Sequence, residues 1–128
     1  MLTPSVILCV DDEGSGLMAR SLFLSKAGYD VIPSADGEAA LKMFRRYHID
    51  LVITDHFLPG ATGTKVAEDM KRFKPKVPIV LFTGALDPPS GSEHADLVLT
   101  KGSMDPPAFL AAIAKLVTKR QSAGIRDD

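Results

Sequence analysis

Three carboxylates, one hydroxyl and one ammonium group stand where apolar stretches of this sequence end. They belong to Asp11, Asp12, Asp55, Thr83 and Lys101. Close carboxylates repel, by up to about 4 kcal/mol for a pair at 4 Å and an effective dielectric constant near 20. A divalent ion would offset that repulsion, and an all-oxygen donor set suits Mg²⁺. Such a set could transfer a phosphoryl group: Asp55 would attack phosphorus, Mg²⁺ and Lys101 would neutralise the phosphoryl oxygens, and Thr83 would donate a hydrogen bond.

The apolar stretches predict strands that bring these side chains together. Runs without polar alternation are typical of strands buried on both faces of a parallel sheet. The predicted strands are Val6–Val10, Tyr29–Pro33, Leu51–Thr54, Ile79–Phe82 and Asp96–Thr100. Because the carboxyl ends of parallel strands meet at one edge, we expect the polar residues to converge there.

Helical segments alternate with these strands. They are predicted over Leu17–Ala27 with Ser15 as N-cap, over Glu38–Tyr47 after Asp36, from Thr62 or Thr64 to Phe73, and from Asp105 to about Lys119. Ala85–Ala95 contains two prolines and a Ser-Gly-Ser cluster, so the fourth helix in chain order is expected to be short or missing. The alternation predicts an α/β fold, a doubly wound five-stranded parallel sheet.

The first predicted helix is apolar nearly all round. Its inward face is expected to carry Gly16, Ala19, Phe23 and Ala27, widened by Leu24, which leaves Leu17, Met18 and Leu22 outside. A helix of this kind is usually buried on a second side. Two interpretations remain open, extended core packing and a surface for a partner.

Length, charge and cysteine content indicate one soluble domain. The chain has 128 residues, which predicts a domain over residues 1–120 and a frayed tail over 121–128. A net charge of −1 argues against a general nucleic-acid binder. The single cysteine, Cys9, is expected to be a small buried hydrophobe in a reducing, cytoplasmic compartment. No apolar segment approaches the roughly 20 residues of a membrane span.

Several motifs in order along the chain resemble the receiver domain of bacterial two-component response regulators, including the chemotaxis regulators. They are Val10–Glu13, Gly28–Val31, Asp36–Leu41, Asp55 followed by Pro59–Gly60, Thr83–Gly84 and Lys101. The resemblance implies a flavodoxin-like fold with strand order 2-1-3-4-5. It also implies that Asp55 is phosphorylated by a sensor histidine kinase or a histidine phosphotransfer protein. The signal would pass to an unknown downstream protein, with a homodimer as a further option.

The resemblance also implies roles for the metal ligands. Asp12 and Asp55 would bind Mg²⁺ directly, Asp11 through water, and Phe57 through its backbone carbonyl. The segment between Thr83 and Lys101 departs from the family pattern. Val98 stands where the family usually has Tyr or Phe, and Gly102 replaces a proline. Phosphate acceptance is therefore expected to be intact and transmission of the signal altered.

Three classes of function are weighed. The leading one is a phospho-acceptor that signals by binding a partner and is not a turnover enzyme. The alternative is a pseudo-receiver, which binds protein independently of phosphorylation. A phosphatase is disfavoured because such enzymes need a carboxylate two residues after the nucleophile, where this chain has Phe57. His56 could influence hydrolysis of the acyl phosphate or be an exposed bystander.

Overall fold

A five-stranded parallel sheet forms the centre of the computed structural model, which describes residues 3–84, 87–102 and 105–122. Its strands are β1 (Val6–Val10), β2 (Asp30–Ser34), β3 (Leu51–Thr54), β6 (Ile79–Thr83) and β7 (Leu97–Thr100). Their order is β2-β1-β3-β6-β7, with every pair parallel. When only these strands are counted, this is the expected order 2-1-3-4-5, and the prediction is confirmed.

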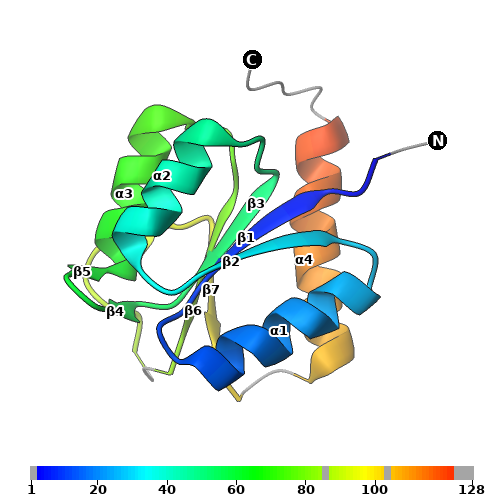
Figure 1. Ribbon diagram of the computed structural model, residues 1–128, viewed down its shortest axis with the longest axis horizontal. Coiled ribbons are helices and arrows are strands. Elements are labelled where there is room, and N and C mark those ends of the chain that lie inside the picture. Colours follow the sequence, from blue (N-terminus) through cyan, green and yellow to red (C-terminus); the bar gives the residue numbers. More distant parts are fainter. Residues whose placement is uncertain (1–2, 85–86, 103–104, 123–128) are drawn as a thin grey trace.

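Helices cover both faces of the sheet (Figure 1). In the described residues the α-helices are α1 (Gly14–Lys26), α2 (Gly37–Arg46), α3 (Gly63–Phe73) and α4 (Pro106–Ser122). The buried residues of α1 and α4 pack in one apolar cluster and those of α2 and α3 in another. The sheet separates the two clusters, because alternate residues of β1 and β3 belong to opposite ones. The doubly wound, flavodoxin-like class is therefore confirmed.

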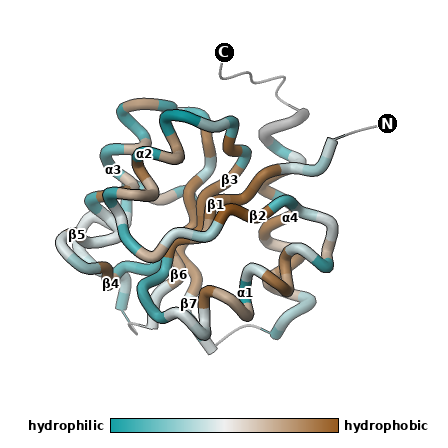
Figure 2. Tube along the Cα trace, in the orientation of Figure 1, coloured by the Kyte–Doolittle hydropathy of each residue, from teal (hydrophilic) through white to brown (hydrophobic). Residues whose placement is uncertain are grey.

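The central strands are apolar on both faces, as their sequences predict. All four residues of β3 and the last four of β1 are buried. Figure 2 shows this hydrophobic centre, with more polar chain around it. Burial on both sides leaves no room for a polar side chain until the strand ends, which is why the functional groups stand at the edge.

Side-chain caps fix where the helices begin. Asp36 accepts a hydrogen bond from the Ala39 backbone N–H (2.7 Å), and Thr62, the earlier of its two candidates, caps α3. The predicted Ser15 cap of α1 is wrong, because Glu13 accepts from the N–H groups of residues 15 and 16. Glu13 is the N-cap residue, and its carboxylate reaches forward to the free N–H groups of the first turn.

The orientation of α1 differs from the prediction. Leu24 is buried and Phe23 packs against the apolar cluster as predicted, but Leu17 is buried as well, and Ala19 and Ala27 are exposed. Met18 and Leu22 are 73% and 56% exposed, so extended core packing does not account for them. The helix is rotated because the long leucines fill the cluster better than the small residues would. A partner surface on α1 stays a prediction.

The chain between β6 and β7 has a single 3₁₀ turn, Ser92–His94, within the described residues 87–96. The expected short or missing fourth helix is confirmed for that part, and residues 85–86 lie outside the described residues. A small hairpin that the sequence did not indicate, β4 (Phe57–Leu58) with β5 (Ala61–Thr62), follows the Asp55 turn. Helix α4 ends at Ser122, so 121 and 122 of the expected tail are helical, and 123–128 lie outside the described residues. No helix in the described ranges has the length and apolar character needed to cross a bilayer.

Candidate functional site

Four strand ends meet at one edge of the sheet. Asp11 follows β1, Asp55 follows β3, Thr83 ends β6, and Lys101 follows β7. Backbone hydrogen bonds continue the parallel pairing to these positions: Asp55 donates to Val10 (2.9 Å), and Lys101 donates to Thr83 (2.7 Å). The strand register therefore sets the positions of side chains that lie up to 90 residues apart in sequence.

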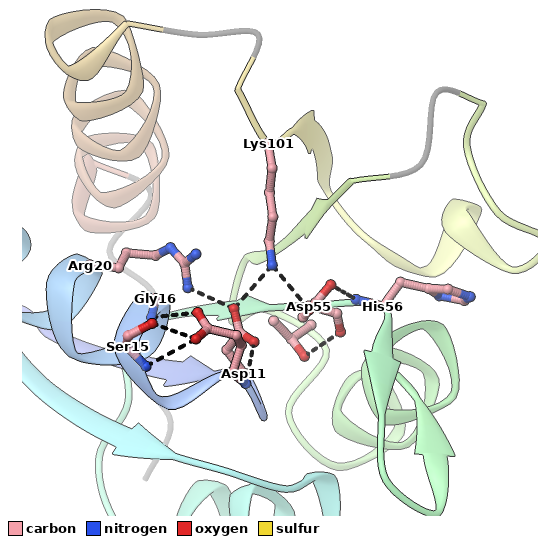
Figure 3. Close-up of polar contacts among 9 residues, drawn as sticks. Asp11, Ser15, Gly16, Arg20, Asp55, His56 and Lys101 are labelled. Atoms are coloured by element: carbon pink, nitrogen blue, oxygen red, sulfur yellow. Dashed lines mark hydrogen bonds and ion pairs between the residues drawn. The ribbon is translucent and has the colours of Figure 1, made fainter.

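Lys101 joins two of the carboxylates. Its Nζ donates to Asp11 Oδ2 and to Asp55 Oδ2, at 3.1 Å each. In Figure 3 the side chain extends from the end of β7 toward both carboxylates. The Lys101 side chain is 31% exposed and those of Asp11 and Asp55 are 1% and 10% exposed, so the pairs are only partly screened by water.

Asp11 is held as a carboxylate by three donors. Burial raises its pKa, but hydrogen bonds from the Glu13 backbone N–H, Lys101 and Arg20 outweigh burial and hold the pKa below its ordinary value. Oδ1 accepts from Glu13 (2.9 Å), while Lys101 and Arg20 both donate to Oδ2. The donors satisfy both oxygens, which makes a buried negative charge tolerable.

Asp55 is fixed from its own backbone and from α3. Its Oδ1 accepts from the His56 N–H (2.7 Å). The Gly63 N–H donates to the His56 carbonyl (2.6 Å), and a Cβ added at Gly63 would lie 1.9 Å from the Asp55 carbonyl oxygen. Only glycine permits this approach. The first residue of α3 therefore helps to fix the position of the Asp55 backbone. Gly63 was not among the residues predicted from the sequence; a glycine next to the Thr62 cap was the available signal.

Arg20 is a second cation at this edge that the sequence analysis also missed. Its Nη1 lies 3.2 Å from Asp11 Oδ2, and its side chain is 13% exposed. The guanidinium stacks over the Phe82 ring, 4.7 Å from the centroid. The available signal was a charged residue in the middle of a mostly apolar helix, but the direction of its side chain depends on the rotation of α1.

Thr83 and Phe57 lie at the edge, and their roles stay predictions. Thr83 is the last residue of β6 and is 1% exposed. Phe57, in β4, is 64% exposed and lines an open pocket together with Asp12. Val98 is half-buried in β7, paired in register with Leu81. Phe82 and Phe109 instead form the aromatic contact near Lys101, with centroids 5.4 Å apart.

His56 is not the exposed bystander of one interpretation. It is 9% exposed, and its ring packs edge-on against Phe57 with centroids 4.9 Å apart. Figure 3 shows the ring directed away from Asp11 and Lys101. Only the backbone N–H of His56 contacts the Asp55 carboxylate among the interactions described.

The acidic residues fit a magnesium ion. Asp11, Asp12 and Asp55 each offer one oxygen, and these three atoms lie within 4.8 Å of one another. Asp12 is exposed while the other two are buried, so the cluster opens to solvent on one side. A hard cation that retains several waters suits such a half-open set of carboxylates.

The fold and this pocket define a doubly wound α/β domain with a cluster of carboxylates and a lysine at the carboxyl edge of its sheet. Residues 7–113 match the response regulator receiver domain, and the chain belongs to this family. The predicted resemblance is confirmed. Receiver domains are generally signalling domains rather than turnover enzymes, and they bind Mg²⁺ at an acidic pocket of this kind.

Known proteins show the same relationship. A probable transcriptional regulator, ycf27, of Porphyridium aerugineum is 41% identical over 81 residues, which is 63% of this chain and 33% of that protein. The receiver domain protein of Methanospirillum hungatei superposes with a TM-score of 0.87 at 23% identity, covering 94% of this chain and 98% of that one. The response regulator TrrA of Thermotoga maritima, in complex with Mg²⁺-BeF, has a TM-score of 0.82 at 32% identity, covering 88% and 98%. The chain spans about a third of the first curated relatives it matches (33% and 32%).

Proposed function

We propose that this chain accepts a phosphoryl group on Asp55 from a histidine kinase or a histidine phosphotransfer protein, in a Mg²⁺-dependent phosphorelay. The observation that carries the proposal is the Asp55 carboxylate at the end of the central strand, 3.1 Å from the Lys101 ammonium and within 4.8 Å of two further carboxylates. Membership of the receiver family supports it. The comparisons give no support to the alternative of a pseudo-receiver.

The proposed chemistry is an in-line displacement at phosphorus. A carboxylate oxygen of Asp55 forms a P–O bond as the P–N bond of the donor's phosphohistidine breaks, and the electron pair of that bond stays on the imidazole, which takes up a proton. The His56 N–H and Lys101 hold the two Asp55 oxygens, so the nucleophile is oriented before the donor arrives. The Thr83 hydroxyl would donate a hydrogen bond to the transferred phosphoryl group.

Asp11, Asp12, Asp55 and the Phe57 carbonyl would hold Mg²⁺, which when bound supplies positive charge to the phosphoryl oxygens. The Lys101 ammonium, which contacts Asp55 Oδ2, would also supply positive charge to the phosphoryl oxygens. The chain's own residues therefore orient the nucleophile and stabilise the negative charge on the phosphoryl oxygens. These two tasks are most of what phosphoryl transfer requires of a protein.

The output is proposed to be a protein-protein interaction with an unnamed downstream partner. The curated relatives include proteins named as transcriptional regulators and one named as a sensor kinase/phosphatase, and this chain matches 33% and 12% of their lengths. Their whole-protein activities do not identify the partner of this chain. A homodimer remains an option within the same proposal.

Incubation with acetyl phosphate and Mg²⁺, followed by mass spectrometry of the intact protein, tests the assignment. We expect one added phosphate, absent in Asp55→Asn, because the amide has no free carboxylate oxygen to attack phosphorus. Asp87→Asn is the matched control, since Asp87 is exposed in the loop after β6. Its labelling should equal that of the native chain.

Two outcomes would contradict the proposal. Labelling that persists in Asp55→Asn would move the acceptor elsewhere, and no labelling of the native chain with either acetyl phosphate or a phosphorylated histidine donor would favour a pseudo-receiver. Sustained release of inorganic phosphate over many turnovers would instead indicate a phosphatase.

A further inference from the structure

Asp11 shares one oxygen between two cations. Lys101 Nζ and Arg20 Nη1 lie 3.1 and 3.2 Å from its Oδ2. Lys101 also contacts Asp55, whereas the ion pair described for Arg20 is with Asp11 alone. Figure 3 shows the two cationic side chains approaching Asp11 from different elements, the end of β7 and helix α1. If Lys101 turns toward a phosphoryl group on Asp55, Arg20 keeps Asp11 paired.

An aromatic wall holds Arg20 in this position. Its guanidinium lies 4.7 Å from the centroid of Phe82, the residue before Thr83 in β6. Phe82 packs in turn against Phe109 of α4, at a centroid distance of 5.4 Å. A planar guanidinium can stack on a ring and donate at its edge at the same time. The arginine is therefore fixed from three elements, α1, β6 and α4.

The charge of the pocket depends on this residue. Three carboxylates and the Lys101 ammonium sum to −2, and the Arg20 guanidinium makes the sum −1. An added Mg²⁺ therefore brings the pocket to +1 with Arg20 and to 0 without it. An acyl phosphate of about two negative charges in place of the Asp55 carboxylate lowers each sum by one. The phosphorylated, Mg²⁺-bound pocket is then neutral only when Arg20 is present.

We propose that Arg20 is a second positioning cation of the phospho-acceptor pocket, which opposes Mg²⁺ binding before phosphorylation and stabilises the pocket after it. This inference rests on the proposed function, because it takes Asp11, Asp12 and Asp55 as the metal site. Arg20 acts through Asp11 and through its charge, without contact to the reacting atoms.

Calorimetric titrations of Arg20→Met test the two halves of the proposal separately. The methionine keeps an apolar chain of similar length beside Phe82 and removes the charge. We expect Mg²⁺ to bind about fivefold more tightly, the size of effect that a neighbouring unit charge has on a divalent ion even in a medium as polar as water. At saturating Mg²⁺, beryllofluoride, an anionic analogue of the phosphoryl group, should bind about fivefold more weakly.

Opposite signs distinguish the charge from a structural role, since a pocket that is merely loosened would bind both ligands more weakly. Arg72→Met is the control: Arg72 lies in the last turn of α3, 71% exposed and paired with Glu68, and both affinities should stay native. Equal affinities in Arg20→Met and the native chain, or a loss of both, would overturn the proposal. If neither the native chain nor Arg20→Met binds Mg²⁺, the metal site of the proposed function fails as well.

A measurement on the native chain keeps the proposal falsifiable if Arg20→Met does not fold. The guanidinium resonances of Arg20 should shift in NMR spectra as Mg²⁺ is added, because its partner Asp11 belongs to the metal site. Those of Arg72 should not move. Native Mg²⁺ binding, seen at the Asp12 amide, with an unmoved Arg20 side chain would overturn the role of Arg20 and leave the metal site intact.

Discussion

The two helical layers close the phospho-acceptor pocket in different ways. On the α2–α3 side the closure is backbone against backbone, where Gly63 meets Asp55 with no room for a Cβ. On the α1–α4 side the closure is made by long side chains, Arg20 and Lys101, next to an open pocket lined by Phe23, Phe82 and other residues. The α2–α3 side can fix the position of the Asp55 backbone, and the α1–α4 side can change the net charge of the pocket.

This difference separates two tasks within one site. The close-packed contact between Gly63 and the Asp55 carbonyl leaves no space for rearrangement. A displacement of α3 therefore displaces Asp55 as well. Lys101, whose side chain is 31% exposed and contacts both Asp11 and Asp55, can exchange partners at small energetic expense, while Arg20 stays against Phe82. We expect substitutions on the α3 side to reduce stability and labelling together, and substitutions on the α1 side to change electrostatics first.

The largest effect is expected for Gly63→Ala. The new Cβ would lie 1.9 Å from the Asp55 carbonyl oxygen, so either α3 or the acceptor backbone must move. We expect a loss of about 3 kcal/mol in the free energy of unfolding by urea titration, the upper part of the range for overpacked sites. Labelling of Asp55 by acetyl phosphate should fall at the same time.

Gly14→Ala is the matched control, because Gly14 is likewise the first residue of its helix. An added Cβ there meets nothing within 4 Å. Its stability should stay within about 1 kcal/mol of the native value. Equal losses of unfolding free energy in Gly63→Ala and Gly14→Ala would contradict the proposed difference between the α2–α3 side and the α1–α4 side.

A smaller effect is expected for Lys101→Met in Mg²⁺-free buffer. Removing the ammonium leaves Asp11 and Asp55 to repel each other, and we expect a loss of about 1–2 kcal/mol, since the lysine is partly exposed. Saturating Mg²⁺ should recover part of the loss by supplying charge. Lys65→Met, which removes exposed pairs on α3, should change stability by less than about 0.5 kcal/mol. A loss no larger than in that control would show that the Lys101 pairs are merely surface pairs.

The smallest effect is a pH dependence at Asp11. Its pKa in the folded chain lies below the ordinary value of 3.8, because its hydrogen bonds outweigh burial. A lowered pKa contributes stability that is fully present above about pH 4 and is lost as the pH falls through the folded pKa. Urea titrations in Mg²⁺-free buffer from about pH 5 to pH 3 should therefore show a steeper loss for the native chain than for Asp11→Asn. Parallel slopes would contradict the assignment.

Much of the fold followed from local pattern. Unbroken apolar runs identified β1, β3 and β6, short apolar stretches indicated the outer strands β2 and β7, and the capping residues Asp36 and Thr62 placed two helix starts. The β4–β5 hairpin was missed because its strands are two residues long and show no periodicity. The inward face of α1 was predicted only in part, correctly for Phe23 and Leu24, because a helix that is apolar nearly all round gives no single direction.

The sequence by itself determined which residues stand at the carboxyl ends of the strands, and hence that Asp11, Asp55 and Lys101 would share an edge. This was accessible because strand ends and parallel topology are set by hydrophobic pattern. Only the tertiary structure decided that Arg20 reaches Asp11 and that Gly63 lies against Asp55. Those contacts depend on how α1 and α3 are rotated and placed against the sheet, and that is decided by packing between elements rather than by any single segment.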